Sequence, residues 1–248
     1  MTTHKGRIAV VTGAARGIGQ AVAAGLAARG AAIVGVDITE AVETRALVES
    51  SAAEWLGIVA DVSSPGDVTR VREEALARFG RCDILVNVAG IFPACPFDEL
   101  SFDAWRKVLD VNLDSQFLMS QAFVPSMKEK GWGRIVNFTS GSVQLSVPNM
   151  AAYKASKMGA IGLTRGMAAD LGQYGITVNA ASPSFTRTPG ALSIPAAADR
   201  LEAIAKQQAI KRISEPEDVV GLILFLTGED SHFVTGQTIL ADGGLCYF

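Results

Sequence analysis

The chain has 248 residues, of which 49% are hydrophobic, and a formal net charge of −3. This charge excludes the strongly basic surface typical of nucleic-acid-binding domains. The longest apolar run covers residues 219–226, far short of the ~18 residues of a membrane span, and the first seven residues lack the apolar stretch of a signal peptide.

The chain is predicted to form one domain over residues 1–248, because no Pro/Ser-rich linker or charge run divides it. Cys82, Cys95 and Cys246 are scattered and lack the spacing of metal ligands, so we expect no metal and reduced thiols in the cytoplasm.

Short apolar segments alternate with segments of helical periodicity along the whole chain. The predicted strands centre on Ile8, Ile33, Ile58, Ile84, Ile135, Val178 and Ile239. Repeated alternation of strand and helix predicts an α/β domain, doubly wound, with a parallel seven-stranded sheet, helices on both faces and right-handed crossovers.

A glycine-rich turn follows the first predicted strand. The motif TGAARGIG at residues 12–19 precedes a periodic segment of small residues at 21–28. Glycines in such a strand–turn–helix unit let backbone N–H groups approach a pyrophosphate at the positive end of the helix. The motif therefore predicts a Rossmann-type dinucleotide site.

The second predicted strand ends at Asp37, about 20 residues beyond the glycines, the spacing of an acidic residue that binds the ribose hydroxyls. A carboxylate there repels a 2′-phosphate and favours NAD over NADP. Arg16 in the turn favours NADP instead, because a cation there could reach a 2′-phosphate. Ile38, after Asp37, adds no second cation.

Two serines carry the pattern of a helix N-cap, with proline in the first turn and an acid three residues later. They open the segments Ser64-Pro-Gly-Asp67 and Ser214-Glu-Pro-Glu217. We expect a helix to begin at each.

Tyr153 and Lys157 stand four residues apart, with Ser140 upstream. Side chains at i and i+4 share a helix face. A cation beside a phenol lowers the phenol pKa from its usual ~10. The spacing thus predicts an acid/base pair, with Lys157 lowering the pKa of Tyr153.

These motifs together resemble the short-chain dehydrogenase/reductase family over the whole chain. The resemblance rests on TGxxxGxG at 12–19, Asp61-Val62, the segment NVAG at 87–90, Asn112, Ser140, Tyr153, Lys157 and the ending TGQTILADGG at 235–244. It implies an NAD-dependent oxidoreductase acting on a CH–OH group.

The resemblance also implies the site residues. The cofactor would be bound by Gly13, Arg16, Gly17, Ile18, Gly19, Asp37, Ile38, Asp61, Val62, Asn87, Ala89, Gly90, Tyr153, Lys157, Pro183, Ser184, Phe185, Thr186 and Thr188. The catalytic set would be Asn112, Ser140, Tyr153 and Lys157, and the substrate would contact Phe92, Ser140, Ser142, Tyr153 and Phe185.

Each catalytic residue has an implied role. Ser140 holds the substrate oxygen, Tyr153 takes the alcohol proton, and Lys157 binds the nicotinamide ribose. Asn112 kinks its helix and holds a water of the proton relay. Two positions depart from the family pattern: Val88 replaces Asn, and Ser184 replaces Gly.

By the same analogy, the pocket is apolar and partly aromatic, and residues 188–210 form a mobile lid that excludes water. An uncharged pocket favours a neutral secondary alcohol, hydrophobic or aromatic, and its ketone. An NADPH-dependent ketoacyl or steroid-type ketoreductase is the alternative, and a non-enzymatic NAD sensor is a third candidate that should have lost Tyr153 or Lys157.

Other chemistries lack the necessary residues. A serine hydrolase needs a histidine base, whereas the only histidines are His4 and His232 and there is no G-x-S-x-G motif. A zinc alcohol dehydrogenase needs clustered Cys and His ligands.

The helix that carries Tyr153 has small or apolar residues around much of its circumference from 155 to 168. A helix with two apolar faces needs a second burial surface. We therefore expect a homo-oligomer, specifically a homotetramer, paired through the helices of Asn112 and Tyr153.

Overall fold

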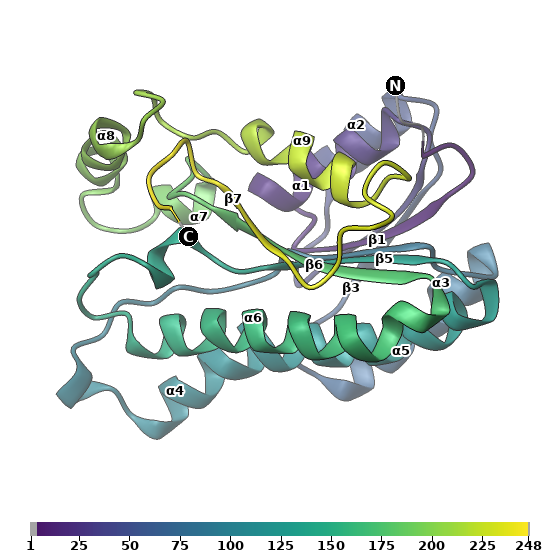
Figure 1. The fold of residues 1–248 in the computed structure, drawn as a ribbon, viewed down its shortest axis with the longest axis horizontal. Coiled ribbons are helices and arrows are strands. Elements are labelled where there is room, and N and C mark those ends of the chain that lie inside the picture. The colour runs from purple at the N-terminus through teal and green to yellow at the C-terminus, as the bar shows by residue number, and fades with distance from the viewer. Residues whose placement is uncertain (1–3, 248) are drawn as a thin grey trace.

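The computed structural model describes residues 4–247 and shows one parallel sheet between two layers of helices (Figure 1). The strands are β1 (Ile8–Thr12), β2 (Ala32–Asp37), β3 (Trp55–Val59), β4 (Ile84–Asn87), β5 (Gly133–Phe138), β6 (Ile176–Pro183) and β7 (Thr238–Ala241). Their order is β3-β2-β1-β4-β5-β6-β7, and every pairing is parallel. The predicted fold class and all seven predicted strands are confirmed.

The helices form the two covering layers and the end of the molecule. They are α1 (Gly17–Ala27), α2 (Val42–Ser50), α3 (Pro65–Phe79), α4 (Phe102–Leu109), α5 (Ser115–Lys130), α6 (Ala151–Leu171), α7 (Pro189–Leu192), α8 (Ala197–Gln207) and α9 (Glu217–Leu226). Short 3₁₀ segments occur at Phe97–Glu99, Gly141–Val143 and Gly172–Tyr174, and a π-helical turn, η2, spans Asp110–Asp114.

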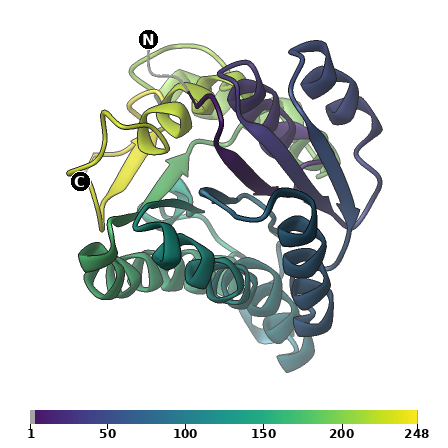
Figure 2. The same cartoon turned by 90° about the vertical axis from the view of Figure 1, so that its right-hand side faces the viewer.

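Each face of the sheet has its own hydrophobic core, as expected when buried parallel strands are apolar on both sides. One core joins the sheet to α3, α5 and α6, and the other joins it to α1, α2 and α9. Figure 2, which looks from the side, shows the two helical layers separated by the strands. Among residues 4–247, no helix has both the length and the apolar character needed to cross a bilayer.

One of the two predicted N-caps is confirmed and the other is wrong. The hydroxyl of Ser64 accepts a hydrogen bond from the Asp67 backbone N–H and caps α3. The hydroxyl of Ser214 is buried and lies 3.2 Å from that of Thr186, so it is not free to cap α9. The Asp218 carboxylate instead accepts the N–H of Glu215 ahead of that helix.

The parallel arrangement places the carboxyl ends of all strands at one edge of the sheet. This is the end of the molecule where α7 and α8 lie (Figure 1). The glycine turn, Asp37, the loop after β4, Ser140 and the segment after β6 all follow strand ends at this edge. Ligands of open parallel sheets bind outside this edge.

Candidate active site

The glycine turn connects β1 to α1 in a conformation that needs its glycines. Gly13 and Gly17 have φ values of +66° and +61°, in the left-handed region. A Cβ on Gly19 would lie 2.0 Å from the carbonyl oxygen of Gly13. The turn therefore closes tightly onto the start of α1, whose free N–H groups suit a pyrophosphate.

Asp37 lies beside this turn. One carboxylate oxygen accepts a hydrogen bond from the Ala15 N–H at 2.9 Å, and the other accepts one from the Thr39 N–H at 3.2 Å. The carboxylate thus joins the end of β2 to the turn, in the position expected for a ribose ligand. Arg16 and Ile38, both exposed, lie on the two connected segments.

The loop after β4 is fixed to β1 through Thr12. The Thr12 hydroxyl oxygen accepts hydrogen bonds from the backbone N–H groups of Val88 and Ala89 at 3.0 and 3.1 Å. Val88 therefore joins the loop to the sheet through its backbone, although it lacks the side-chain amide that is usual at this position. Asn87 points instead to Asn137 of the neighbouring strand, at 2.9 Å.

Asp61 and Val62 follow the end of β3. The Ser63 hydroxyl donates to the Asp61 carboxylate at 2.6 Å, and this hydrogen bond holds the pKa of Asp61 below its usual value. Lys107 of α4 lies 3.7 Å from the same carboxylate. Val62 is buried in the core, on the same side of the sheet as α3.

Ser140, Tyr153 and Lys157 meet where β5 ends against α6. Ser140 lies two residues beyond Phe138, the last residue of β5, and its hydroxyl lies near enough to the Tyr153 phenol to favour a lower pKa of that phenol. Lys157 is 3% exposed, and its Nζ donates to the Phe138 carbonyl at 2.9 Å. Nζ lies 5.8 Å from the centre of the Tyr153 ring.

Burial dominates the titration of this pair. Desolvation raises the pKa of Tyr153, and the hydrogen bond with Ser140 opposes that rise. Desolvation lowers the pKa of Lys157 to about 8. The predicted direction of the Tyr153 shift is therefore wrong: the pKa is raised, not lowered, because the cost of burying the phenolate outweighs the interactions that favour it.

Asn112 lies at the centre of the π-helical turn between α4 and α5 and is fully buried. Its side chain accepts from the Ile91 N–H and donates to the Ile91 carbonyl, both at 2.8 Å, and also donates to Ser156 at 3.1 Å. The helix irregularity that the family resemblance implied at Asn112 is present as this π-turn, a feature that often marks functional positions. The side chain itself ties the π-turn to the loop after β4 and to α6.

The expected substrate side is bounded by Phe92 and the lid segment. The Phe92 and Tyr153 rings meet edge to face, with their centres 6.3 Å apart. A Cβ on Gly190 of α7 would lie 3.7 Å from Phe92. Ser142 accepts a hydrogen bond from the Ser140 hydroxyl at 2.9 Å.

The segment after β6 contacts both the glycine turn and the lid. Thr188 caps α7, and a Cβ on Gly17 would lie 3.1 Å from its methyl carbon. Ser184, where the family pattern has glycine, donates to Gln208 at the end of α8 at 2.8 Å. Pro183 and Thr186 are buried, and Phe185 is partly exposed. The segment Pro183–Thr188 therefore lies between the glycine turn and the lid.

Two residues that support the site escaped the sequence analysis. The Thr139 hydroxyl donates to the Lys157 carbonyl at 2.9 Å, and the Ser156 hydroxyl donates to the Tyr153 carbonyl at 2.7 Å. Each hydroxyl holds the backbone of a residue that the sequence analysis predicted to be catalytic. No local pattern distinguishes them from ordinary serine and threonine, because their partners come from tertiary contacts or from the turn of α6 itself.

Comparison with known proteins extends over nearly the whole chain. The family described as "Enoyl-(Acyl carrier protein) reductase" matches residues 13–246. The chain is 37% identical to a (2S)-[(R)-hydroxy(phenyl)methyl]succinyl-CoA dehydrogenase subunit of Thauera aromatica, over 98% of this chain and 97% of that one. It is 34% identical to the 3-oxoacyl-[acyl-carrier-protein] reductase of Escherichia coli, over 97% and 98%.

A solved structure of a similar protein has the same fold as this chain. The structure described as a putative NAD(P)-dependent gluconate 5-dehydrogenase from Beutenbergia cavernae, with bound NADP at low occupancy, superposes with a TM-score of 0.92. It is 37% identical and covers 98% of each chain.

Proposed function

Because the chain belongs to the short-chain dehydrogenase/reductase family, whose members are oxidoreductases, we propose that it interconverts a neutral secondary alcohol and its ketone with NAD. The substrate is hydrophobic or aromatic. The observation that carries this proposal is the junction of β5 and α6, which brings Ser140, Tyr153 and Lys157 together.

Each residue has a defined task in this reaction. Ser140 hydrogen-bonds to the substrate oxygen, and Tyr153 removes the alcohol proton in oxidation or returns it in reduction. The buried Lys157 ammonium, held by the Phe138 carbonyl, stabilises the phenolate as it forms. A nicotinamide cofactor bound at the glycine turn supplies the hydride acceptor or donor.

The preference for NAD rests on Asp37. Its carboxylate lies beside the turn and would accept hydrogen bonds from ribose hydroxyls, whereas it would repel a 2′-phosphate. Arg16 and the NADP in the Beutenbergia cavernae structure support the opposite preference.

The substrate class rests on the aromatic wall made by Phe92 against Tyr153. Relatives whose names describe ring-bearing alcohols support the presence of a ring in the substrate. One is the Thauera aromatica protein, and another is a cis-4-hydroxycyclohexanecarboxylate dehydrogenase of Sinomonas cyclohexanicum, 38% identical over 96% of each chain. The alternative, an NADPH-dependent ketoacyl reductase, is supported by the Escherichia coli relative.

The test measures kcat/KM for 1-phenylethanol oxidation and acetophenone reduction with both cofactors, in the wild type and in Tyr153→Phe. We expect NAD(H) to be preferred and Tyr153→Phe to lose about 10²–10⁴-fold in kcat. Tyr174→Phe is the control, since Tyr174 is 39% exposed at the far end of α6. Near-normal turnover by Tyr153→Phe would refute the mechanism, and a preference for NADPH with a 3-oxoacyl substrate would favour the alternative.

Two further properties belong to the proposal. The active form is a homotetramer, and exposed apolar side chains on α5 and α6 support this. The protein acts in the cytoplasm, where its three unpaired cysteines stay reduced.

A further inference from the structure

Gln116, in the first turn of α5, is a polar side chain with no exposure to solvent. It lies one helical turn beyond Asn112 and faces the sheet rather than water. A buried amide is costly unless its hydrogen bonds are made. A leucine would fill a similar volume at this position without that cost.

The amide shares its acceptor with Lys157. Nε2 of Gln116 donates to the Phe138 carbonyl oxygen at 3.1 Å, and Nζ of Lys157 donates to the same oxygen at 2.9 Å. A carbonyl oxygen has two lone pairs, so it can accept both hydrogen bonds. Gln116 from α5 and Lys157 from α6 thus meet at the last residue of β5.

The same short segment carries Ser140. After Phe138, the Thr139 hydroxyl donates to the Lys157 backbone carbonyl, and the Ser140 hydroxyl lies near the Tyr153 phenol, whose pKa it influences. The position of the Phe138 carbonyl therefore sets the place of the ammonium directly and that of the serine hydroxyl two residues on. Gln116 holds this carbonyl from α5, the helix beside α6 in the same layer.

The oxygen of the Gln116 amide has no hydrogen-bond partner in the protein and is buried. An unpaired buried acceptor opposes folding. The amide oxygen of Gln116 therefore lowers the stability of the folded chain, whereas its amide N–H group holds the carbonyl to which Lys157 is hydrogen-bonded.

We propose that Gln116 is a positioning residue, which holds the Phe138 carbonyl so that Lys157 and Ser140 are correctly placed. The consequence for turnover rests on the proposed function, whereas the placement of Gln116 beside Lys157 does not.

The first experiment compares Gln116→Leu with Gln121→Leu, a substitution of an exposed glutamine on the same helix. With acetophenone and NADH, we expect Gln116→Leu to lose about 10- to 100-fold in kcat, as small displacements of catalytic groups do. Gln121→Leu should match the wild type. Wild-type kcat in a folded Gln116→Leu protein, alongside an inactive Tyr153→Phe, would overturn the inference and leave the proposed function standing.

The second experiment needs no turnover. NMR titration of the ¹³Cε-labelled lysines gives the pKa of Lys157 in Gln116→Glu and Gln121→Glu. A carboxylate beside the shared carbonyl should raise this pKa above its value of about 8 by about one unit or more, and the same charge at position 121 should leave it unchanged. An unchanged pKa in Gln116→Glu would overturn the inference, even if Gln116→Leu failed to fold.

A third measurement separates positioning from packing. In Gln116→Glu, the protonated carboxyl group can donate an O–H to the Phe138 carbonyl, as the glutamine amide does, whereas leucine cannot. The kcat of Gln116→Glu relative to wild type should therefore recover as the pH falls, with no recovery in Gln116→Leu. Equal pH profiles of the two variants would show a packing role only, and would overturn the proposal.

Discussion

Lys157 lies in a buried site that disfavours its charged form. Burial lowers its pKa from 10.5 to about 8, so the folded state favours the neutral amine. Below pH 8 the lysine is charged in both the folded and the unfolded chain, and the folded chain bears the whole cost of burying that charge. This contribution to instability fades as the pH rises from 8 to 10.5.

Lys157→Met should therefore increase the free energy of unfolding at pH 7 while abolishing turnover. The shift corresponds to an upper limit of about 3 kcal/mol at ~1.4 kcal/mol per pKa unit, reduced by the lost hydrogen bond to Phe138. Urea unfolding at pH 7 and pH 10 measures it, with exposed Lys130→Met as the control. A variant less stable than wild type at pH 7 would contradict the argument.

Asp37 has a structural role beside its proposed cofactor role, since its two oxygens accept hydrogen bonds from Ala15 and Thr39. Asp37→Asn keeps an acceptor for the turn but removes the charge. We expect the ratio of kcat/KM for NAD over NADP to fall at least about tenfold, the effect of ~1.4 kcal/mol of lost discrimination. An unchanged ratio would mean that Arg16 or another group determines cofactor choice.

At the scale of elements, the β1–α1 unit depends on a close backbone approach. A methyl group on Gly19 would collide with the Gly13 carbonyl, a backbone atom that cannot rotate away. Gly19→Ala should therefore raise the Kd for NADH by more than tenfold, or prevent folding, as NADH fluorescence titration and circular dichroism would show. Gly221→Ala in α9 is the matched control, because nothing lies within 4 Å of its Cβ and alanine favours a helix.

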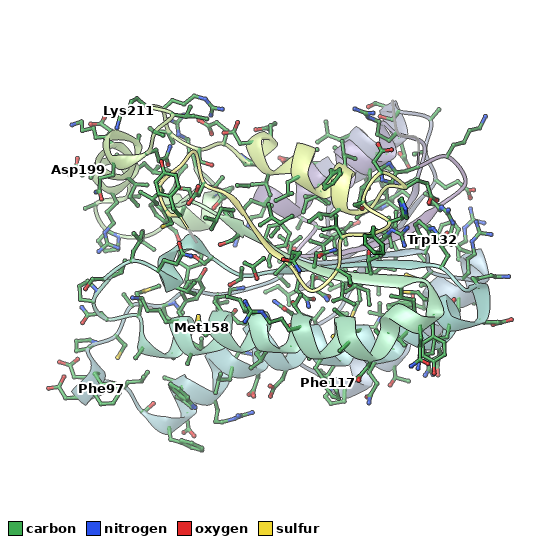
Figure 3. All side chains as sticks on the ribbon, viewed as in Figure 1. Phe97, Phe117, Trp132, Met158, Asp199 and Lys211 are labelled. Carbon is green, nitrogen blue, oxygen red and sulfur yellow. The ribbon has the colours of Figure 1, made fainter. Side chains whose placement is uncertain are left out.

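At the scale of the whole molecule, the helical layer of α5 and α6 exposes large apolar side chains. Phe117 is 47% exposed and Met158 is 53% exposed (Figure 3). A symmetric pairing of subunits would bury both. Sedimentation at micromolar concentration should give four times the 26.0 kDa chain mass.

Phe117→Glu should dissociate this assembly, because it places a charge in an apolar contact. Val42→Glu, a change at an exposed apolar residue on α2 in the other helical layer, should leave it intact. An active species of 26.0 kDa in the wild type would refute the tetramer.

The sequence by itself determined the features that depend on local chemistry and periodicity. Alternating apolar and helical segments identified all seven strands and the parallel sheet. The glycine turn and the Ser64 cap were also readable, because each depends on residues within a few positions of one another, whereas the irregular helix at Asn112 was implied by the family resemblance.

Only the tertiary structure decided which groups lose water and which distant groups meet. His4 lies only four residues from the start of the sequence, yet it is buried and its imidazole hydrogen-bonds to Thr227, 223 residues away. Ser214 had the pattern of a cap, but its buried hydroxyl hydrogen-bonds to that of Thr186 from another loop. The Tyr153/Lys157 spacing predicted the wrong direction for the Tyr153 pKa shift, and the shared carbonyl of Gln116 and Lys157 had no sequence signal. Desolvation depends on everything packed around a side chain, and a one-dimensional pattern cannot record what the folded chain brings from elsewhere.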